Sequence, residues 1–335
     1  MSALVGMIGS ALLSALAVAI YLRAARRRGW LDAPNHRSSH EEATPSSGGV
    51  AVLGVLVPLA ALWLILGTPA GTAGTIVPIR EALLSLTAAA LLCLIGAWDD
   101  LRPLPAGLRL MVFVGLTLMV VAAWLPPREL ADLALVLILG VALAWLVNLY
   151  NFMDGIDGLA ALQCVLVALA MAWLARLGGA SAQYEVFALL IAGSYLGFLF
   201  FNRPPARLFM GDAGSLSAGL LLGCLGLWAW REAWVPATAW LLLMSPFLVD
   251  TGWTLAARAL RGAPLAEAHR EHGYQRLARH WQSHGFVDMA LLGMFSLWLF
   301  PLTLLQQRMP EKAVTIFLLG LFPQLLLMVR LRRLQ

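Results

Sequence analysis

Long uncharged runs alternate with short charged segments along the whole chain. Such runs predict membrane-spanning helices, because about 20 apolar residues are needed to cross about 30 Å of hydrocarbon. Several apolar cores are shorter than this and need tilting or polar flanks to span. The predicted spans are residues 2–22, 49–68, 81–98, 108–125, 131–149, 158–177, 185–201, 213–230, 234–257, 286–305 and 313–330. The pattern therefore predicts an all-α, polytopic membrane protein with about eleven transmembrane helices, in which residues 1–335 form a single integral membrane domain.

The basic residues between the runs indicate how the spans are oriented. Lys and Arg accumulate in the cytoplasmic loops of membrane proteins. With the N-terminus outside, 17 of the 23 basic residues fall on the inner side, and the outer side keeps Arg80, Arg128, Arg176, Arg231, Arg308 and Lys312. The sequence therefore predicts an external N-terminus, a cytoplasmic C-terminus, and two long inner segments at about 23–48 and 258–285.

Composition narrows the class of protein. Hydrophobic residues make up 61% of the 335 positions and charged residues 12%, and the mean hydropathy is +0.81. Soluble domains are nearer half apolar and a quarter charged. The net charge of +5 would suit nucleic acid, but the basic residues lie between apolar runs. Membrane topology accounts for them, and no nucleic-acid partner is expected.

Two polar groups lie at predicted inner ends in the first third of the chain. The loop after the first span ends in Gly48 and Gly49, whose backbone N–H groups could approach a phosphate; an ordinary Pro/Gly loop is the alternative. Asp99 and Asp100 are adjacent at the end of the third span, where the helix dipole and their mutual repulsion disfavour them. A bound cation or a proton-transfer task would explain this pair, and a solvated helix end is the alternative.

Four oxygen-bearing side chains lie just before the sixth predicted span, at Asn148, Asn151, Asp154 and Asp157. They alternate with apolar residues, and Gly155 and Gly158 permit tight turns. Hard oxygen ligands in this setting suit Mg²⁺ or a nucleotide, whereas a plain turn would rarely concentrate them at a membrane surface.

The later polar segments carry cations and histidines. After the seventh span, Arg203 and Arg207 can hold phosphates, and Asp212 follows Gly211 directly before the eighth span. In the last long inner segment, His269 and His272 lie one helical turn apart and predict an amphipathic surface helix that carries some binding side chains. A zinc site is the alternative there, but it lacks a cysteine ligand.

One carboxylate, Asp250, lies inside the ninth apolar run. A charge near the bilayer centre costs roughly 2.5–3.5 kcal/mol, so Asp250 is a functional candidate unless it lies close to the inner end. Transporters place their polar residues near the midplane, but here the clusters lie at inner ends. The residues by themselves therefore predict Mg²⁺-dependent phosphate chemistry at a cytosolic membrane face, with a transporter or lipid flippase as the rival class.

The motifs D-D, N-x-x-N-F-M-D-G-I-D-G and F-M-G-D-x-G-S, in this order, resemble those of the polyprenyl-phosphate N-acetylhexosamine-1-phosphate transferases, bacterial glycosyltransferase family 4. The resemblance covers nearly the whole chain and implies Mg²⁺, with Mn²⁺ as a substitute. The P-N-x-R-S-S-H and H-R-E-H-G-Y-Q segments are most similar to the branch that initiates O-antigen synthesis. Where that branch reads T-P-R-G-G-G, this chain has Ser46 and Ser47 before Gly48 and lacks the arginine.

The resemblance also implies roles for individual residues. Asp212 matches the metal ligand, with Asp100 as a second metal candidate. Asp99 and Asp100 match the acidic pair, one of which is proposed to activate the lipid phosphate. Asn148, Asn151, Asp154 and Asp157 match nucleotide and metal residues, and His269 and His272 match a segment implicated in sugar recognition.

The resemblance predicts a bacterial inner-membrane enzyme whose active site faces the cytoplasm. It transfers an N-acetylhexosamine-1-phosphate from a UDP-sugar to undecaprenyl phosphate, releases UMP and initiates a surface glycan. A phospho-MurNAc-pentapeptide translocase is the alternative within the family. The identity of the sugar, the polymer, and the choice between monomer and homodimer stay open.

Overall fold

The computed structural model describes residues 3–32, 43–66, 78–264 and 269–331. Within these ranges, eleven helical segments are long and apolar enough to cross a membrane, which confirms the predicted all-α, polytopic fold. They are α1 (Ala3–Arg28), α2 (Gly49–Leu66), α3 (Ile79–Leu101), α4 (Ala106–Trp124), α5 (Leu130–Met153), α6 (Leu159–Leu177), α7 (Ala182–Asn202), α8 (Gly211–Arg231), α9 (Ala237–Leu260), the segment His284–Arg308 and the segment Pro310–Leu331. Helices suit this setting because each satisfies its own backbone hydrogen bonds in lipid.

The last two spanning segments are composite. The first consists of α11 (His284–Met294), a π-helical turn η1 (Phe295–Leu299) and α12 (Phe300–Arg308). The second joins a short 3₁₀ turn, η2 (Pro310–Lys312), to α13 (Ala313–Leu331).

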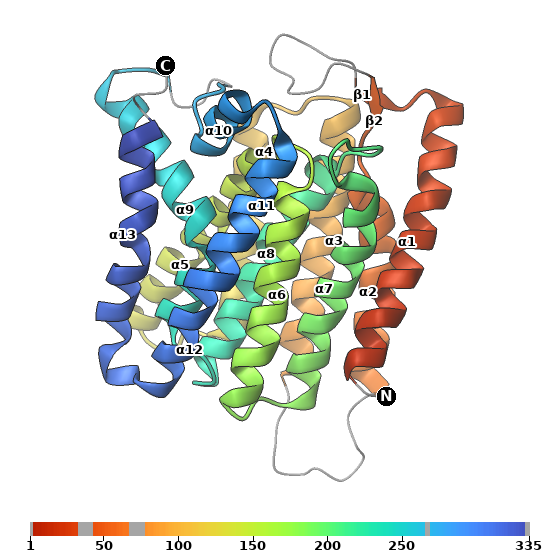
Figure 1. Ribbon diagram of the computed structural model, residues 1–335. Coiled ribbons are helices and arrows are strands. Elements are labelled where there is room, and N and C mark those ends of the chain that lie inside the picture. The colour runs from red at the N-terminus through yellow and green to blue at the C-terminus, as the bar shows by residue number, and fades with distance from the viewer. Residues whose placement is uncertain (1–2, 33–42, 67–77, 265–268, 332–335) are drawn as a thin grey trace.

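The small elements gather at one end of the bundle (Figure 1). They are α10 (Gly273–Trp281) and the antiparallel pair of two-residue strands β1 (Leu31–Asp32) and β2 (Thr44–Pro45). Helices α3, α5, α9 and α13 finish at this end, and α8 begins there. All the predicted polar clusters within the described residues therefore lie at one end of the bundle, which we call the polar end.

Helix α8 forms the centre of the bundle, with 89% of its spanning window buried, against 22% for the peripheral α1 and α4. It packs against α2, α3, α5, α6 and α9. Small residues permit this close approach: a Cβ on Gly96 of α3 would overlap the backbone of Asp212 and Ala213, and one on Gly49 of α2 would overlap Gly214. The first turn of α8 is thus held against α2 and α3.

Three helix boundaries differ from the predicted spans in a way that matters for the site. Helix α3 continues to Leu101 and includes Asp99 and Asp100, and α5 continues to Met153. Helix α8 begins at Gly211, so Asp212 lies in its first turn. The apolar cores ended earlier because hydrophobicity marks the membrane interior, whereas the helices project beyond it.

Candidate active site

Asp99 is a buried carboxylate at the end of α3 with two strong partners. Its Oδ2 lies 2.7 Å from Nη1 of Arg109, which comes from the first turn of α4. Its Oδ1 accepts a hydrogen bond of 2.5 Å from the backbone N–H of Leu104. The short connection between α3 and α4 is therefore built around Asp99.

Asp100 points to the other side and meets the start of α8. Its Oδ1 accepts the backbone N–H of Asp212 at 3.1 Å, and its Oδ2 accepts the Ser47 hydroxyl at 2.5 Å. A backbone hydrogen bond from Ala213 adds to these. The N–H groups of a first helical turn lack partners within their own helix, so Asp100 caps α8 from a neighbouring helix. Ser47 reaches it from a positive φ of 61°.

Asp212 completes the acidic group from the first turn of α8. Its carboxylate lies beside those of Asp99 and Asp100 and has a hydrogen bond with the side chain of Asn151. Its Oδ2 lies 3.8 Å from Nη1 of Arg109, which therefore bridges two acids. Two carboxylates from α3 and an amide from α5 thus converge on Asp212 at the start of α8.

The segment after α5 brings Asp154 into the same group. Burial raises the pKa of Asp154 well above its ordinary value, and the negative charges of Asp212, Asp100 and Asp157 raise it further. Asn148 lies one turn before Asn151 on α5 and is half-buried. We call Asp99, Asp100, Asp154 and Asp212, with Asn151 and Arg109, the acid cluster.

Asp157 is close to the acid cluster but is held by other parts of the chain. Its Oδ2 accepts the backbone N–H of Ala206 at 3.0 Å and lies 3.3 Å from Nδ1 of His284 at the start of α11. The buried Asn202 accepts the N–H of Gly158 and donates to the Leu208 carbonyl. These contacts tie the loop after α5 to the loop after α7.

The structure corrects the prediction for Gly48 and Gly49. Their backbone N–H groups donate to the carbonyls of Phe209 and Met210, both at 2.9 Å, and do not face an open site. A Cβ on Gly48 would contact Phe198 and Leu208 too closely. Close packing against the start of α8 is the physical reason for this glycine pair.

Arg203 and Arg207 are not brought into the acid cluster. The Arg203 guanidinium lies 4.8 Å from the ring centre of Phe200, and that of Arg207 lies 5.0 Å from the ring centre of Phe201. Both side chains are exposed in the loop that follows α7. Phosphate binding by Arg203 and Arg207 therefore stays a prediction.

The histidines also differ from the expected arrangement. His269 and His272 precede α10 and are not spaced along it; their rings stack at 4.9 Å instead. His272 is buried, with Nδ1 3.1 Å from Oδ1 of Asp250. Burial lowers the pKa of the half-exposed His269 to about 4, and the positive charges of His272 and Arg258 add to the effect. His269 is therefore a neutral imidazole at physiological pH.

Asp250 explains how this segment is fixed. It lies toward the polar end of α9 and accepts the backbone N–H groups of Gly273 at 2.9 Å and Tyr274 at 2.8 Å. It thus caps α10 from α9. Tyr274 then donates its hydroxyl to the carbonyl of Phe152 at 3.0 Å, next to the Asp154 segment. A chain of contacts therefore connects the histidine segment to the acid cluster.

The sequence did not indicate which residues hold the others in place. No positioning role was predicted for Arg109, Ser47, Asn202, His284 or Tyr274, although Ser47, Asn202 and Tyr274 lie within or beside the polar segments described above. Arg109 alone carried a usable signal, because it is a cation ten residues after Asp99 at the start of the next span. The others act through contacts between distant segments.

The acid cluster offers oxygen donors that bear on divalent-cation binding. Among the described residues, no three His, Cys, Asp or Glu side chains form a ready-made metal site. Mg²⁺, however, is usually held by one or two carboxylates together with substrate phosphates. The Asp212, Asp100 and Asp154 carboxylates crowd together with an amide from Asn151. These hard oxygen donors fit a cation that shares its coordination with a phosphorylated substrate.

The fold and the site define a polytopic membrane protein with an acidic site at the ends of its central helices. A family model described as "Glycosyl transferase family 4" matches residues 82–229, which include Asp99, Asp100, Asp154 and Asp212. The chain is 29% identical over 283 residues to a "Probable undecaprenyl-phosphate N-acetylglucosaminyl 1-phosphate transferase" of Bacillus subtilis, which covers 79% of this chain and 74% of the relative.

Two further relatives carry the name "Phospho-N-acetylmuramoyl-pentapeptide-transferase". The protein of Gluconacetobacter diazotrophicus is 27% identical over 330 residues, covering 82% of this chain and 88% of its own. That of Heliobacterium modesticaldum is 46% identical, but only over 104 residues, or 31% of this chain and 30% of its own. The family model and these relatives support the resemblance of the chain to the superfamily of polyprenyl-phosphate hexosamine-1-phosphate transferases.

Proposed function

We propose that the protein transfers an N-acetylhexosamine-1-phosphate from a UDP-sugar to undecaprenyl phosphate. The observation that carries this proposal is the convergence of Asp99, Asp100, Asp154 and Asp212 from three segments at one end of the spanning bundle. The names of the relatives support an undecaprenyl phosphate acceptor and a sugar-1-phosphate donor. A site at the helix ends suits this pair of substrates, because one is soluble and the other lies in the bilayer.

In the proposed reaction, an oxygen of the lipid phosphate attacks the β-phosphorus of the UDP-sugar. The bond between the β-phosphorus and the bridging oxygen breaks, and UMP leaves with that oxygen. The product is a polyprenyl-diphospho-sugar. The chemistry depends on positioning and on charge stabilisation, as in other phosphoryl transfers.

The acids then have distinct proposed tasks. Asp212 and Asp100 would hold Mg²⁺, which supplies charge neutralisation on the diphosphate and the leaving UMP. Asp99 orients Arg109, whose guanidinium faces Asp212. No obligatory base is needed, because a phosphate monoester has a second pKa near ~6 and is largely dianionic at neutral pH.

We further propose that the polar end faces the cytoplasm of the bacterial inner membrane. Support comes from the basic residues, which are concentrated in the segments at this end. Cysteines introduced at the exposed His280 and Glu311 would then label from opposite sides, His280 from the cytoplasm. The native Cys93, Cys164 and Cys224 are buried and would contribute little background.

UMP release tests the function directly. Membranes that contain the protein would be given undecaprenyl phosphate and a panel of UDP-sugars, including UDP-MurNAc-pentapeptide. We expect UMP release with at least one UDP-N-acetylhexosamine and none without the lipid phosphate. Release only with UDP-MurNAc-pentapeptide would select the second candidate, which the names of several relatives favour. No release with any donor would contradict the proposal.

If an N-acetylhexosamine is the donor, we propose that the product begins a surface glycan such as O-antigen. The support is the sequence of the first inner loop and of the histidine segment, which are most similar to the branch that initiates O-antigen synthesis. The acceptor reaction with purified protein and a defined UDP-sugar, followed by mass analysis of the lipid product, would name the sugar.

A further inference from the structure

A second charged group at the polar end has the opposite sign to the acid cluster. It surrounds Glu271, which lies between α9 and α10. The guanidinium groups of Arg258 and Arg261 both bind the Glu271 carboxylate, and Nη2 of Arg276 lies 4.0 Å from it. One carboxylate thus serves three arginines, and two positive charges stay uncompensated within this group.

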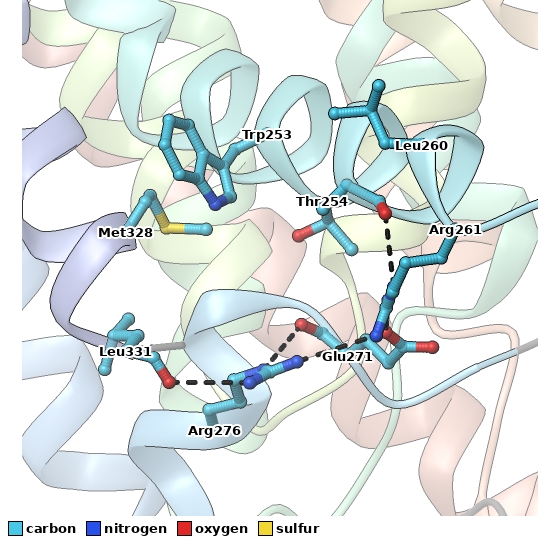
Figure 2. Close-up of a pocket in the computed structure, with 9 residues that line it drawn as sticks. Trp253, Thr254, Leu260, Arg261, Glu271, Arg276, Met328 and Leu331 are labelled. Atoms are coloured by element: carbon cyan, nitrogen blue, oxygen red, sulfur yellow. Dashed lines mark hydrogen bonds and ion pairs between the residues drawn. The ribbon is translucent and has the colours of Figure 1, made fainter. Parts of the chain in front are cut away.

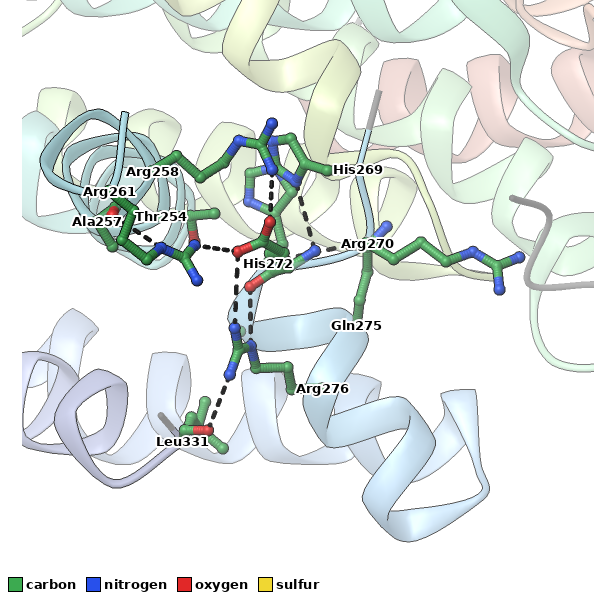
Figure 3. A network of polar contacts seen from close by, with 12 residues as sticks. Thr254, Ala257, Arg258, Arg261, His269, Arg270, His272, Gln275, Arg276 and Leu331 are labelled. Carbon is green, nitrogen blue, oxygen red and sulfur yellow. Dashed lines mark hydrogen bonds and ion pairs between the residues drawn. The ribbon is translucent and has the colours of Figure 1, made fainter. Parts of the chain in front are cut away.

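More cations lie on the same side of α10. Arg279 donates to the backbone carbonyl of Arg270 at 3.0 Å. Burial lowers the pKa of Arg279, and the positive charges of Arg276 and Arg270 lower it further. Figure 3 shows the network, in which Arg258 comes from α9, Arg261 follows the last residue of α9, and Arg276 comes from α10. The local excess of positive charge is therefore shared by two elements.

A pocket of about 290 Å³ opens beside these arginines, between α9, α10 and α13. Figure 2 shows Arg261, Glu271 and Arg276 around it together with Trp253 and Met328. Thr254 and apolar side chains of α9 and α13 form the rest of its lining, and Leu260 beside Arg261 is 86% exposed. Because α9 and α13 are spanning helices, the apolar part of the pocket faces the membrane layer and the charged part faces its surface.

We propose that this pocket binds an anionic phospholipid from the leaflet at the polar end. The headgroup phosphate would lie at Arg261 and Arg276, and an acyl chain would lie along Trp253, Leu260 and Met328. Basic pockets between spanning helices attract anionic headgroups, and a tryptophan at the membrane interface suits the boundary between headgroup and chain. A free phosphate would gain nothing from the apolar wall, so the lining favours an amphiphile.

The site is separate from the acid cluster. Within the described residues, no hydrogen bond or ion pair joins Glu271 and its arginines to Asp99, Asp100 or Asp212. Binding at the pocket would join α9, α10 and α13, and so would stabilise the position of α10. The proposal does not depend on which reaction the protein catalyses.

Native mass spectrometry of the full-length protein in detergent would measure lipid retention directly. The purified protein would be titrated with phosphatidylglycerol and, separately, with phosphatidylcholine. We expect one phosphatidylglycerol to be retained at concentrations where phosphatidylcholine is lost. Arg261→Gln should weaken retention about five-fold, because it removes one positive charge at the headgroup. Equal retention of the two lipids would overturn the proposal.

Two further variants separate the site from general effects. Ala257→Leu fills part of the pocket without changing its charge, and it should also weaken phosphatidylglycerol retention. Arg308→Gln removes an exposed arginine from the opposite end of the bundle and should leave retention within two-fold of the original. Retention unchanged in both Arg261→Gln and Ala257→Leu would overturn the proposal even if either variant were less stable.

Competition distinguishes the sources of phosphate. The protein with bound phosphatidylglycerol would be mixed with inorganic phosphate or, separately, with undecaprenyl phosphate. Each competitor would be added at the same concentration as the phosphatidylglycerol. We expect neither to displace the phospholipid. Displacement by inorganic phosphate would identify a bare anion site, and displacement by undecaprenyl phosphate would assign the pocket to the acceptor lipid; either result overturns the proposal.

Discussion

The acid cluster and the group around Glu271 lie at the same end of the bundle but are opposite in charge. The acid cluster has four carboxylates and one guanidinium, that of Arg109, which contacts Asp99 and Asp212. Around Glu271, three guanidinium groups share one carboxylate. The first excess of charge suits a cation with a phosphorylated substrate, and the second suits an anion. Position at a membrane surface therefore does not determine what a polar cluster binds; the local balance of charge does.

The two regions also differ in how they are held. The acid cluster rests on helices that approach closely at glycines, and Asp100 caps α8 directly. The histidine segment is attached to α9 through Asp250 and reaches the acid cluster through Tyr274. We therefore expect substitutions in the acid cluster to abolish turnover and substitutions in the histidine segment to adjust it.

The largest effect is expected at Asp212. Asp212→Asn should lower kcat by more than ~100-fold, because it removes a charged ligand where negative charge develops. Glu232→Gln is the matched control, since Glu232 caps the opposite end of α8. The assay is UMP release by variants that insert at the same level. Near-normal activity in Asp212→Asn, or full activity of the original protein in excess EDTA, would remove Asp212 from the mechanism.

Arg109 should have the next largest effect. Arg109→Ala leaves the buried Asp99 without its guanidinium partner and should lower kcat about 10- to 100-fold, as for partners of metal ligands elsewhere. Arg109→Lys should recover part of this loss because it restores the charge but not the fork geometry. Arg231→Ala, at the far end of α8, is the control. If the alanine and lysine variants were both as active as the control, the ion pair of Asp99 and Arg109 would have no role in turnover.

A smaller effect is expected at His269. His269→Ala should raise the KM for the UDP-sugar about 3- to 10-fold, the value of one neutral hydrogen bond. Inhibition by UMP should be unchanged, because UMP carries no sugar. Equal loss of UMP and UDP-sugar binding would contradict sugar recognition, and lost stability with unchanged KM would indicate a packing role.

The pH dependence of the same residue follows from its lowered pKa. Because the pKa of His269 in the folded protein is about 4, against an ordinary value of 6.5, the ring is neutral across pH 6 to 8. The KM for the UDP-sugar should therefore be flat in that range. As the pH falls, His269 is protonated in the unfolded chain at a higher pH than in the folded protein. The stability contributed by this group is therefore complete above about pH 6.5 and falls as the pH drops toward 4. A KM that changed with a midpoint near 6.5 would contradict a neutral His269.

The smallest effect is expected at Tyr274. Tyr274→Phe removes the hydrogen bond to Phe152 and should cost about 1 kcal/mol of stability. It should also lower kcat/KM about three-fold, because Asp154 loses part of its support. Tyr184→Phe is the matched control: Tyr184 is also buried and donates to a backbone carbonyl, that of Leu225, far from the acid cluster. If both variants lost stability alike and neither changed kcat/KM, Tyr274 would have no positioning role.

The sequence predicted the number and class of the spans because hydrophobic length is a local property of the chain. It also predicted which residues carry hard oxygen ligands, since the motifs are local too. Asp99, Asp100, Asn151, Asp154 and Asp212 do meet in the structure. Their roles in metal binding and catalysis stay predictions.

Only the tertiary structure decided which partners these residues have. The sequence of Gly48 and Gly49 was compatible with a phosphate-binding loop. In the structure, however, their N–H groups donate to the carbonyls of Phe209 and Met210. The spacing of His269 and His272 predicted that both lie on one face of a helix. In the structure, α10 begins after them, at Gly273, whose N–H donates to Asp250. In each case the deciding contact comes from a segment more than 20 positions away along the chain. The local sequence of this protein determined which hydrogen-bond donors, acceptors and charges each segment carries. Packing determined which of these groups remain available, because a group that is hydrogen-bonded inside the fold is no longer free for a substrate.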